Sequence, residues 1–226
     1  MKHVFKRFLC ILTCSIISFN SQGQVTVTNP ANTTPNLAAT YTSLENALTA
    51  LNTITAISGP VTISLDAGNP QTAPVGGYVI NFATITNTAT SPVTISGSGN
   101  TITAFSPQAS GLLTDAIFKI IGADYITIQN FIMQENSSNT SATPASNNMT
   151  EWGVALLYKI NTNGAQNNTI KNMKIIYLLV YILIYPVTTT TKSITFQRLL
   201  RYEPSCNTKP RAIILSAASK QKIPIK

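Results

Sequence analysis

Four carboxylates in the middle of the chain are the residues that could carry out catalysis: Asp115, Asp124, Glu135 and Glu151. Glycoside hydrolases use two facing carboxylates, one as an acid and the other as a base or nucleophile. Glu135 and Glu151 bracket a Ser/Thr/Asn-rich segment, so a loop there would bring both to one rim of the fold. They are the two candidate catalytic residues, although solvation at the surface is the commoner role. Asp115 and Asp124 each precede a predicted strand, a position typical of turn residues.

Other catalytic and metal-binding residue types are missing from residues 24–170. The single histidine is His3, and the cysteines are Cys10, Cys14 and Cys206. Histidine acid–base chemistry and a thiolate zinc site are therefore excluded from this region. Calcium binds Asp, Glu and carbonyl oxygens, but the chain has no Asp-x-Asp-x-Asp motif. We predict no cofactor and no specific metal site.

The net charge of +8 comes from the two ends of the chain. Residues 24–170 carry two Lys, no Arg and six acidic residues, a charge of −4. Residues 171–226 carry ten Lys or Arg against one Glu, a charge of +9. The middle has no basic stripe for phosphates, which excludes a nucleic-acid partner there.

Residues 1–23 have the pattern of a secretory signal peptide. A basic start precedes an apolar run from Phe8 to Phe19, and Ser21-Gln-Gly23 offers small residues for cleavage before Gln24. The apolar run is shorter than the about 20 residues needed to cross a bilayer. Cleavage is therefore favoured over a membrane anchor, and we expect a secreted or outer cell-surface protein.

One amphipathic helix is predicted at 42–51, within an N-terminal unit of residues 24–58. Val25–Asn29 alternates apolar and polar residues and predicts a first strand. Thr42-Ser-Leu-Glu45 fits a capping box with Thr42 as the N-cap. One apolar helix face follows from the spacing of Leu44, Ala47, Leu48 and Leu51. A single helix ahead of many strands is expected to cap the end of a sheet stack.

Short strands rich in Thr, Ile and Val recur through residues 59–173. Aligning them superposes four isoleucines at spacings of 32, 33 and 42 residues: Ile63, Ile95, Ile128 and Ile170. Periods of 20–50 residues indicate a solenoid, and strands of this composition with Gly or Asn corners indicate a β-solenoid. Alternation would direct the isoleucines inward and the threonines outward.

Asparagine follows two of these strands, as Asn130 and Asn172. Both would occupy equivalent corners of successive coils. Asparagine tolerates a left-handed backbone there, and its side-chain amide can bond the next amide in the stack.

These features together resemble the right-handed parallel β-helix (pectin-lyase-like) superfamily, in particular large secreted surface proteins of Bacteroidetes. The resemblance is carried by four segments: Ser21–Gln24, Tyr41–Leu48, Ala123–Asn130 and Ala165–Asn172. It covers about residues 24–172. It implies an all-β fold, a right-handed parallel β-helix with one N-terminal capping helix. Such proteins are typically much longer and often exported by a type IX secretion system, but no C-terminal sorting domain is recognisable.

Residues 174–226 depart from this pattern and are predicted to form an irregular tail. Charged residues rise from 8 among the 147 positions of 24–170 to 11 among the 56 of 171–226. Ile175–Tyr185 is apolar throughout, unlike a two-faced strand. We hypothesise a broken reading frame near 172–175, leaving an N-terminal fragment with an aberrant or disordered basic tail. The alternative is a genuine apolar strand or helix before a basic tail. Membrane contact by 175–187 is disfavoured because the apolar run is short.

Two functions fit the sequence. The first is a non-catalytic scaffold, stalk or adhesin that contacts extracellular polysaccharide. The second is the N-terminal fragment of a polysaccharide lyase or glycoside hydrolase, since the enzymes of this fold use clustered carboxylates, calcium and an Arg or Lys base. The lack of Arg and His in residues 24–170 favours the first.

Overall fold

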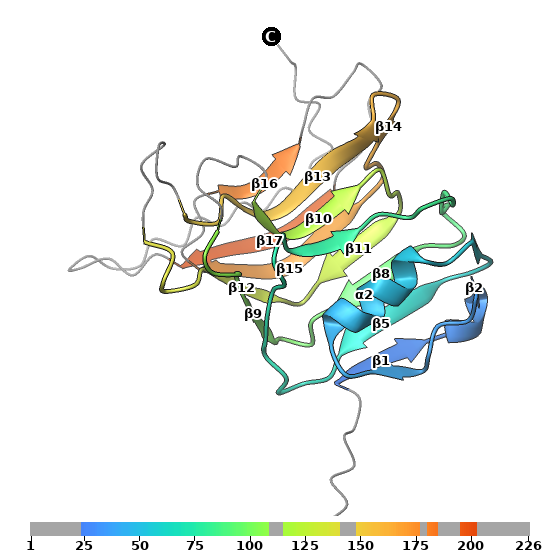
Figure 1. Cartoon of the computed structure of the whole chain (residues 1–226), viewed down its shortest axis with the longest axis horizontal. Coiled ribbons are helices and arrows are strands. Elements are labelled where there is room, and N and C mark those ends of the chain that lie inside the picture. Colours follow the sequence, from blue (N-terminus) through green and yellow to red (C-terminus); the bar gives the residue numbers. More distant parts are fainter. Residues whose placement is uncertain (1–23, 109–114, 141–147, 177–179, 185–194, 203–226) are drawn as a thin grey trace, which may run out of the picture.

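The computed structural model describes residues 24–108, 115–140, 148–176, 180–184 and 195–202. The predicted signal peptide and most of the predicted tail lie outside these ranges. The described part is mostly β-structure with one α-helix, which confirms the predicted all-β class. Its strands lie beside one another in three columns (Figure 1).

The first strand column is parallel and contains the predicted repeat. It consists of β5 (Val61–Leu65), β8 (Val93–Ser96), β11 (Ile126–Gln129), the first half of β15 (Thr169–Ile176) and β17 (Thr195–Tyr202). Its register pairs Ile63 with Ile95, Ile95 with Ile128, and Ile128 with Ile170. This confirms the predicted alignment, and all four isoleucines are buried.

The second and third strand columns are also parallel. The second contains β6 (Gln71–Thr72), β9 (Thr101–Thr103), β12 (Ile132–Gln134) and the second half of β15. The third contains β7 (Tyr78–Ile80), β10 (Ala116–Ile121), β13 (Trp152–Ile160) and β16 (Val180–Ile184). Side chains from all three columns fill the space between them.

Antiparallel pairs occur beside these columns, so the sheets are mixed. Strand β1 (Val25–Thr28) pairs antiparallel with both β3 (Thr40–Tyr41) and β5. After the short 3₁₀ helix η1 (Pro30–Asn32), β2 (Thr33–Thr34) pairs antiparallel with β4 (Ala56–Ile57). At the other end, β14 (Asn163–Gly164) folds back on β13. The stack is therefore not uniformly parallel.

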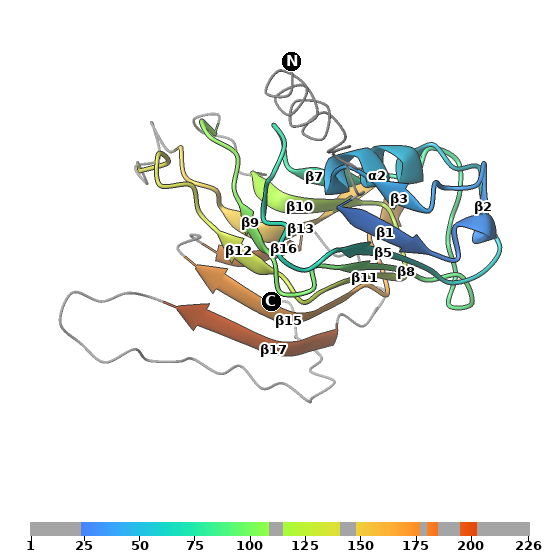
Figure 2. The same cartoon turned by 90° about the horizontal axis from the view of Figure 1, so that it is seen from below.

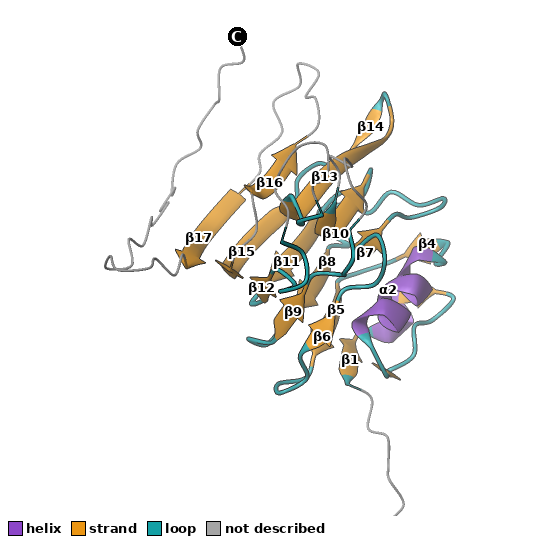
Figure 3. Cartoon of the chain, turned by 60° about the vertical axis from the view of Figure 1, so that its left-hand side comes forward, coloured by secondary structure: helices purple, strands orange, loops and turns teal. Residues whose placement is uncertain are grey.

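The helix α2 (Leu44–Asn52) buries the four predicted apolar residues. It lies beside β7 at the end of the molecule away from β17 (Figures 1 and 3). Asn52 fixes this position, because its amide donates to the Val79 carbonyl and accepts from the Asn81 N–H, both at 2.8 Å.

The predicted capping box at Thr42 is wrong by one residue. Ser43 is the N-cap, and its hydroxyl accepts from the Asn46 N–H at 3.1 Å. Thr42 instead accepts from the Asn46 side chain at 2.9 Å. Both residues are short hydroxyl residues suited to a cap, so the sequence pattern alone did not separate them.

The predicted boundary at residue 173 lies inside β15. Lys174, Ile175 and Ile176 continue this strand and pair in parallel with Ile132, Met133 and Gln134. Beyond it, β16 and β17 are strands in the segment predicted to be irregular, and β17 lies beside β15 (Figure 2). The apolar composition of Ile175–Tyr185 did not prevent strand formation, because β16 within it pairs with β13.

A row of aromatic rings crosses the core between the columns. The ring of Phe118 lies 5.2 Å from that of Tyr78 and 5.2 Å from that of Phe131, measured between centroids. Such tilted pairs are favourable beyond the area that they bury. Phe131 also covers Gly97, where an added Cβ would lie 2.3 Å from the ring.

Candidate functional site

The Glu135 carboxylate is buried and holds together the two ends of a long loop. Its Oε1 accepts hydrogen bonds from Asn136 N and Asn139 Nδ2, both at 2.9 Å, and from Thr150 Oγ1 at 3.1 Å. Its Oε2 accepts from Thr150 N at 2.7 Å. The side chain is only 5% exposed, so the expectation of a solvated surface residue is wrong.

Two further contacts tie this cluster to residues 105–108, which follow β9. Asn139 Nδ2 also donates to the Phe105 carbonyl at 2.8 Å, and Gln108 Nε2 donates to Thr150 Oγ1 at 3.0 Å. The cluster therefore joins three segments of the chain. Burial raises the pKa of Glu135, and the hydrogen bonds from Asn139, Thr150 and Asn136 oppose that rise.

Glu151 follows Thr150 directly and is also buried, at 7% exposure. The prediction that it is a solvated surface residue is wrong as well. The segment that the two glutamates bracket starts at Glu135 and ends beside it, because Thr150 bonds the Glu135 carboxylate. Four hydrogen-bond donors surround the Glu135 carboxylate, so its burial is explained by a structural role as an acceptor.

The other candidate carboxylates have structural contacts. Asp124 Oδ1 accepts from Gln166 N at 2.7 Å, which agrees with its predicted role at a corner. Asp115 is buried ahead of β10. Burial raises the pKa of Asp115, and the nearby Lys119 ammonium opposes that shift.

Lys159, one of two lysines in residues 24–170, also bonds the backbone. Its ammonium donates to the carbonyls of Phe82 and Ala83. These contacts connect β13 to the segment after β7.

In the described ranges, no three Cys, His, Asp or Glu side chains gather as a metal-binding group. Likewise, the described part of the chain contains no helix long and apolar enough to cross a bilayer.

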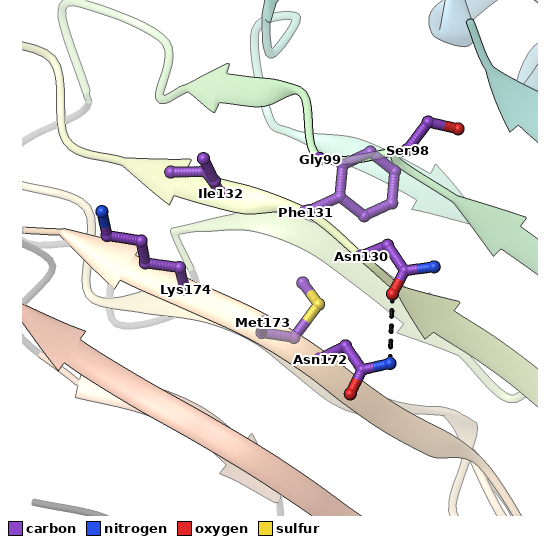
Figure 4. A pocket seen from close by; sticks show the side chains of 8 residues that line it. All are labelled: Ser98, Gly99, Asn130, Phe131, Ile132, Asn172, Met173 and Lys174. Carbon is purple, nitrogen blue, oxygen red and sulfur yellow. Dashed lines mark hydrogen bonds between the residues drawn. The ribbon is translucent and has the colours of Figure 1, made fainter. Parts of the chain in front are cut away.

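A groove with a volume of about 490 Å³ lies beside the turns that follow β8 and β11 and the middle of β15 (Figure 4). Asn130 and Asn172 both adopt left-handed backbone, with φ of 60° and 52°. Asn172 Nδ2 donates to Asn130 Oδ1 at 3.1 Å, so the amides form the predicted ladder. The groove is lined by Ser98, Gly99, Asn130, Phe131, Ile132, Asn172, Met173 and Lys174.

The groove combines amide groups with apolar surface. Phe131 and Met173 are buried at its base, Ile132 is half-buried, and Asn172 and Lys174 are exposed. Amides both donate and accept hydrogen bonds, so the lining suits a ligand rich in hydroxyl groups. The sequence pattern predicted the corner asparagines but not the groove, whose signal was the Asn-apolar pair present at Asn130-Phe131 and again at Asn172-Met173.

A second pocket of about 180 Å³ lies between α2 and the segment 74–79, next to Glu45 and the buried Tyr78. Three half-buried aromatic residues that could stack on sugar rings, Trp152, Tyr125 and Tyr158, line neither pocket.

Comparisons of the chain with known protein families, with curated proteins and with solved structures found no match.

Proposed function

We propose that the chain is a secreted or cell-surface scaffold of the right-handed parallel β-helix (pectin-lyase-like) type, which contacts extracellular polysaccharide without catalysis of its own. The observation that supports it best is the continuous register of Ile63, Ile95, Ile128 and Ile170 in adjacent parallel strands. A repeat of this kind gives an extended surface, which solenoid proteins commonly use for binding.

The environments of the carboxylates support a non-catalytic role. A glycosidase needs two carboxyl groups that face the scissile bond across a site open to substrate. Glu135 is buried and accepts four hydrogen bonds from its own loop, and Asp124 accepts one from the Gln166 backbone. Both carboxylates therefore accept hydrogen bonds from other groups of the protein, as structural residues do.

The groove at Asn130 and Asn172 supports contact with a glycan. It offers the amide groups of Asn130 and Asn172 beside the half-buried apolar side chain of Ile132 (Figure 4). Carbohydrates present hydroxyl groups and apolar C–H faces together, and this lining complements both.

A glycan array with the full chain, together with a depolymerisation assay on uronate polysaccharides, tests the proposal. We expect glycan binding and no turnover. Turnover that is lost in the Glu135→Gln variant and retained in the Glu45→Gln variant would establish the enzyme alternative, since Glu45 is exposed on α2. Absence of binding to every glycan would overturn the contact role.

The proposed export is tested on the mature protein. N-terminal sequencing of material recovered from the medium or the outer surface should begin at Gln24. Recovery only from the cytoplasm, with Met1 retained, would contradict a secreted scaffold.

A further inference from the structure

Five threonines whose side chains the structure describes lie in one row across β1 and the first strand column, and the register continues to Thr195 of β17. The register pairs Thr28 with Thr62, Thr62 with Thr94, Thr94 with Thr127, and Thr127 with Thr169. Neighbouring strands lie about 4.8 Å apart, so the row presents one hydroxyl and one methyl group at each such step. We call these five residues the threonine row.

The threonine row faces away from the core. The residues on either side of Thr62, Thr94, Thr127 and Thr169 are buried, as in β5, where Val61 and Ile63 flank Thr62. Thr28 is exposed, and the other four are half-buried between their neighbours in the row. No hydrogen bond to these five hydroxyl groups is formed within the described part of the chain. Thr26, which lies outside the row, differs because its hydroxyl donates to Asp66 Oδ1 at 3.0 Å.

The row is rigid before any ligand binds. Threonine is branched at Cβ, which restricts its χ1 angle, and backbone pairing on both sides fixes the strands that carry Thr62, Thr94 and Thr127. A surface that is already ordered loses little conformational entropy on binding. Several weak contacts can then act together at a regular spacing.

The surroundings of the threonine row are mostly uncharged. A second outward row runs beside it, where Ser64 pairs with Ser96 and Ser96 with Gln129. Lys171 continues this second row at one end. An acidic polymer would need a series of cations, which this face does not offer, whereas a neutral polymer needs repeated hydrogen-bonding groups.

We propose that the threonine row binds an extended, uncharged polysaccharide whose chain lies along the stack of strands. The inference rests on the proposed function, which it deepens by naming the binding face and the ligand class. An extended β-linked glycan advances along its axis by a distance close to the separation of adjacent strands. Successive sugars can therefore exchange hydrogen bonds with successive threonines, while the threonine methyl groups contact the C–H faces.

The test is binding of the full chain to insoluble neutral polysaccharides, microcrystalline cellulose and chitin, measured by co-sedimentation. The double variant Thr94→Val, Thr127→Val keeps the shape and β-branching of both side chains and removes only the hydroxyls. We expect binding to weaken by about tenfold, since two hydrogen bonds of ordinary strength are lost. The matched control is Thr101→Val, Thr103→Val, because these threonines are half-buried on β9, in the second strand column. The control should bind like the unaltered chain.

Four results would overturn the proposal. They are equal binding by the two double variants, no binding to either neutral polysaccharide, binding only to soluble polygalacturonate, and a dimer of the chain that the Thr94→Val, Thr127→Val variant dissociates. Circular dichroism and urea unfolding confirm that both variants are folded. Glycan binding elsewhere, with the threonine row inert, would leave the proposed scaffold function intact. A chain that binds no glycan on any array would contradict the function itself.

Discussion

The side chain of Asn172 donates a 3.1 Å hydrogen bond to the side chain of Asn130, which lies 42 residues earlier in the chain. Both residues end a strand segment of the first column, and both hold a positive φ. Asparagine therefore has two roles at both positions. It adopts the left-handed backbone, and its side-chain amide bonds the equivalent amide on the neighbouring strand segment.

Replacing Asn130 tests these two demands separately. Asn130→Ala should lower the free energy of unfolding by about 1–2 kcal/mol, because it adds the cost of a left-handed alanine to the lost amide bond. Asn130→Gly loses only the amide bond and should cost less. Urea unfolding measures both, with Asn36→Ala, an exposed loop position, as the control. Equal losses for alanine and glycine would mean that the backbone conformation contributes nothing.

The helix cap gives a second prediction. Ser43→Ala should destabilise the chain by about 1 kcal/mol, the usual effect of losing an N-cap hydroxyl. Thr42→Ala removes only an exposed contact with the Asn46 side chain and should have a smaller effect. Thermal unfolding distinguishes them, and a larger effect at Thr42 would restore the capping box expected from the sequence.

Gly97 and Gly68 form a matched pair for the third prediction. An added Cβ at Gly97 would lie 2.3 Å from Phe131 Cδ1 and 2.6 Å from the Asn130 carbonyl oxygen, so Gly97→Ala forces the corner to move. We expect a loss of about 1–3 kcal/mol from overpacking. Gly68 has a φ of +81° and open space around it, so Gly68→Ala should cost only about 1 kcal/mol from backbone strain. Urea midpoints compare the two, and an equal or greater loss at Gly68 would refute the steric argument.

The fourth prediction concerns pH. Burial raises the pKa of Glu135 in the folded chain above its value in the unfolded chain. The folded state therefore binds the proton more tightly, and this group's stabilising contribution is complete below the unfolded pKa. That contribution is lost as the pH rises through the folded pKa. The free energy of unfolding should therefore decrease as the pH rises above about 4, the pKa of a glutamate in an unfolded chain. Glu135→Gln should make this decrease smaller.

The Asn36→Ala variant, which changes an exposed residue without a titratable group, provides the control for this pH dependence. It should keep the slope of unfolding free energy against pH. Asp115, whose pKa is also raised by burial, contributes a slope of the same sign, so Glu135→Gln should reduce the total slope without abolishing it. A slope unchanged in Glu135→Gln would show that the pKa of this carboxyl is the same in the folded and unfolded chains.

Sequence reasoning predicted the strand register well, because side chains alternate in a strand and a slip of one residue would expose Ile95 or Ile128. The same logic placed Asn130 and Asn172 at equivalent corners. Both predictions needed only the local spacing of residues that recur. The antiparallel pairs, such as β1 with β5, were not predicted because no repeated spacing of residues marks them.

The burial of Glu135 could not be predicted in the same way. Its donors come from Asn139 and Thr150, four and fifteen residues further along the chain. Which of the many Ser, Thr and Asn residues in this segment face the carboxylate depends on the path of the loop. Similarly, the apolar composition after Met173 favoured an irregular tail, whereas pairing of Ile175 with Met133 continues the strand.

The hairpin of β13 and β14 has a consequence for protein engineering. The interval from Ile128 to Ile170 is 42 residues and that from Ile95 to Ile128 is 33, yet both pairs keep the same parallel register. Because Ala116 pairs with Trp152, three of the nine additional residues come before Trp152 and six come after it, where β13 turns back into β14. A foreign peptide inserted between Asn161 and Thr162, both exposed in this turn, should therefore leave the paired strands aligned, which makes this position suited to epitope display.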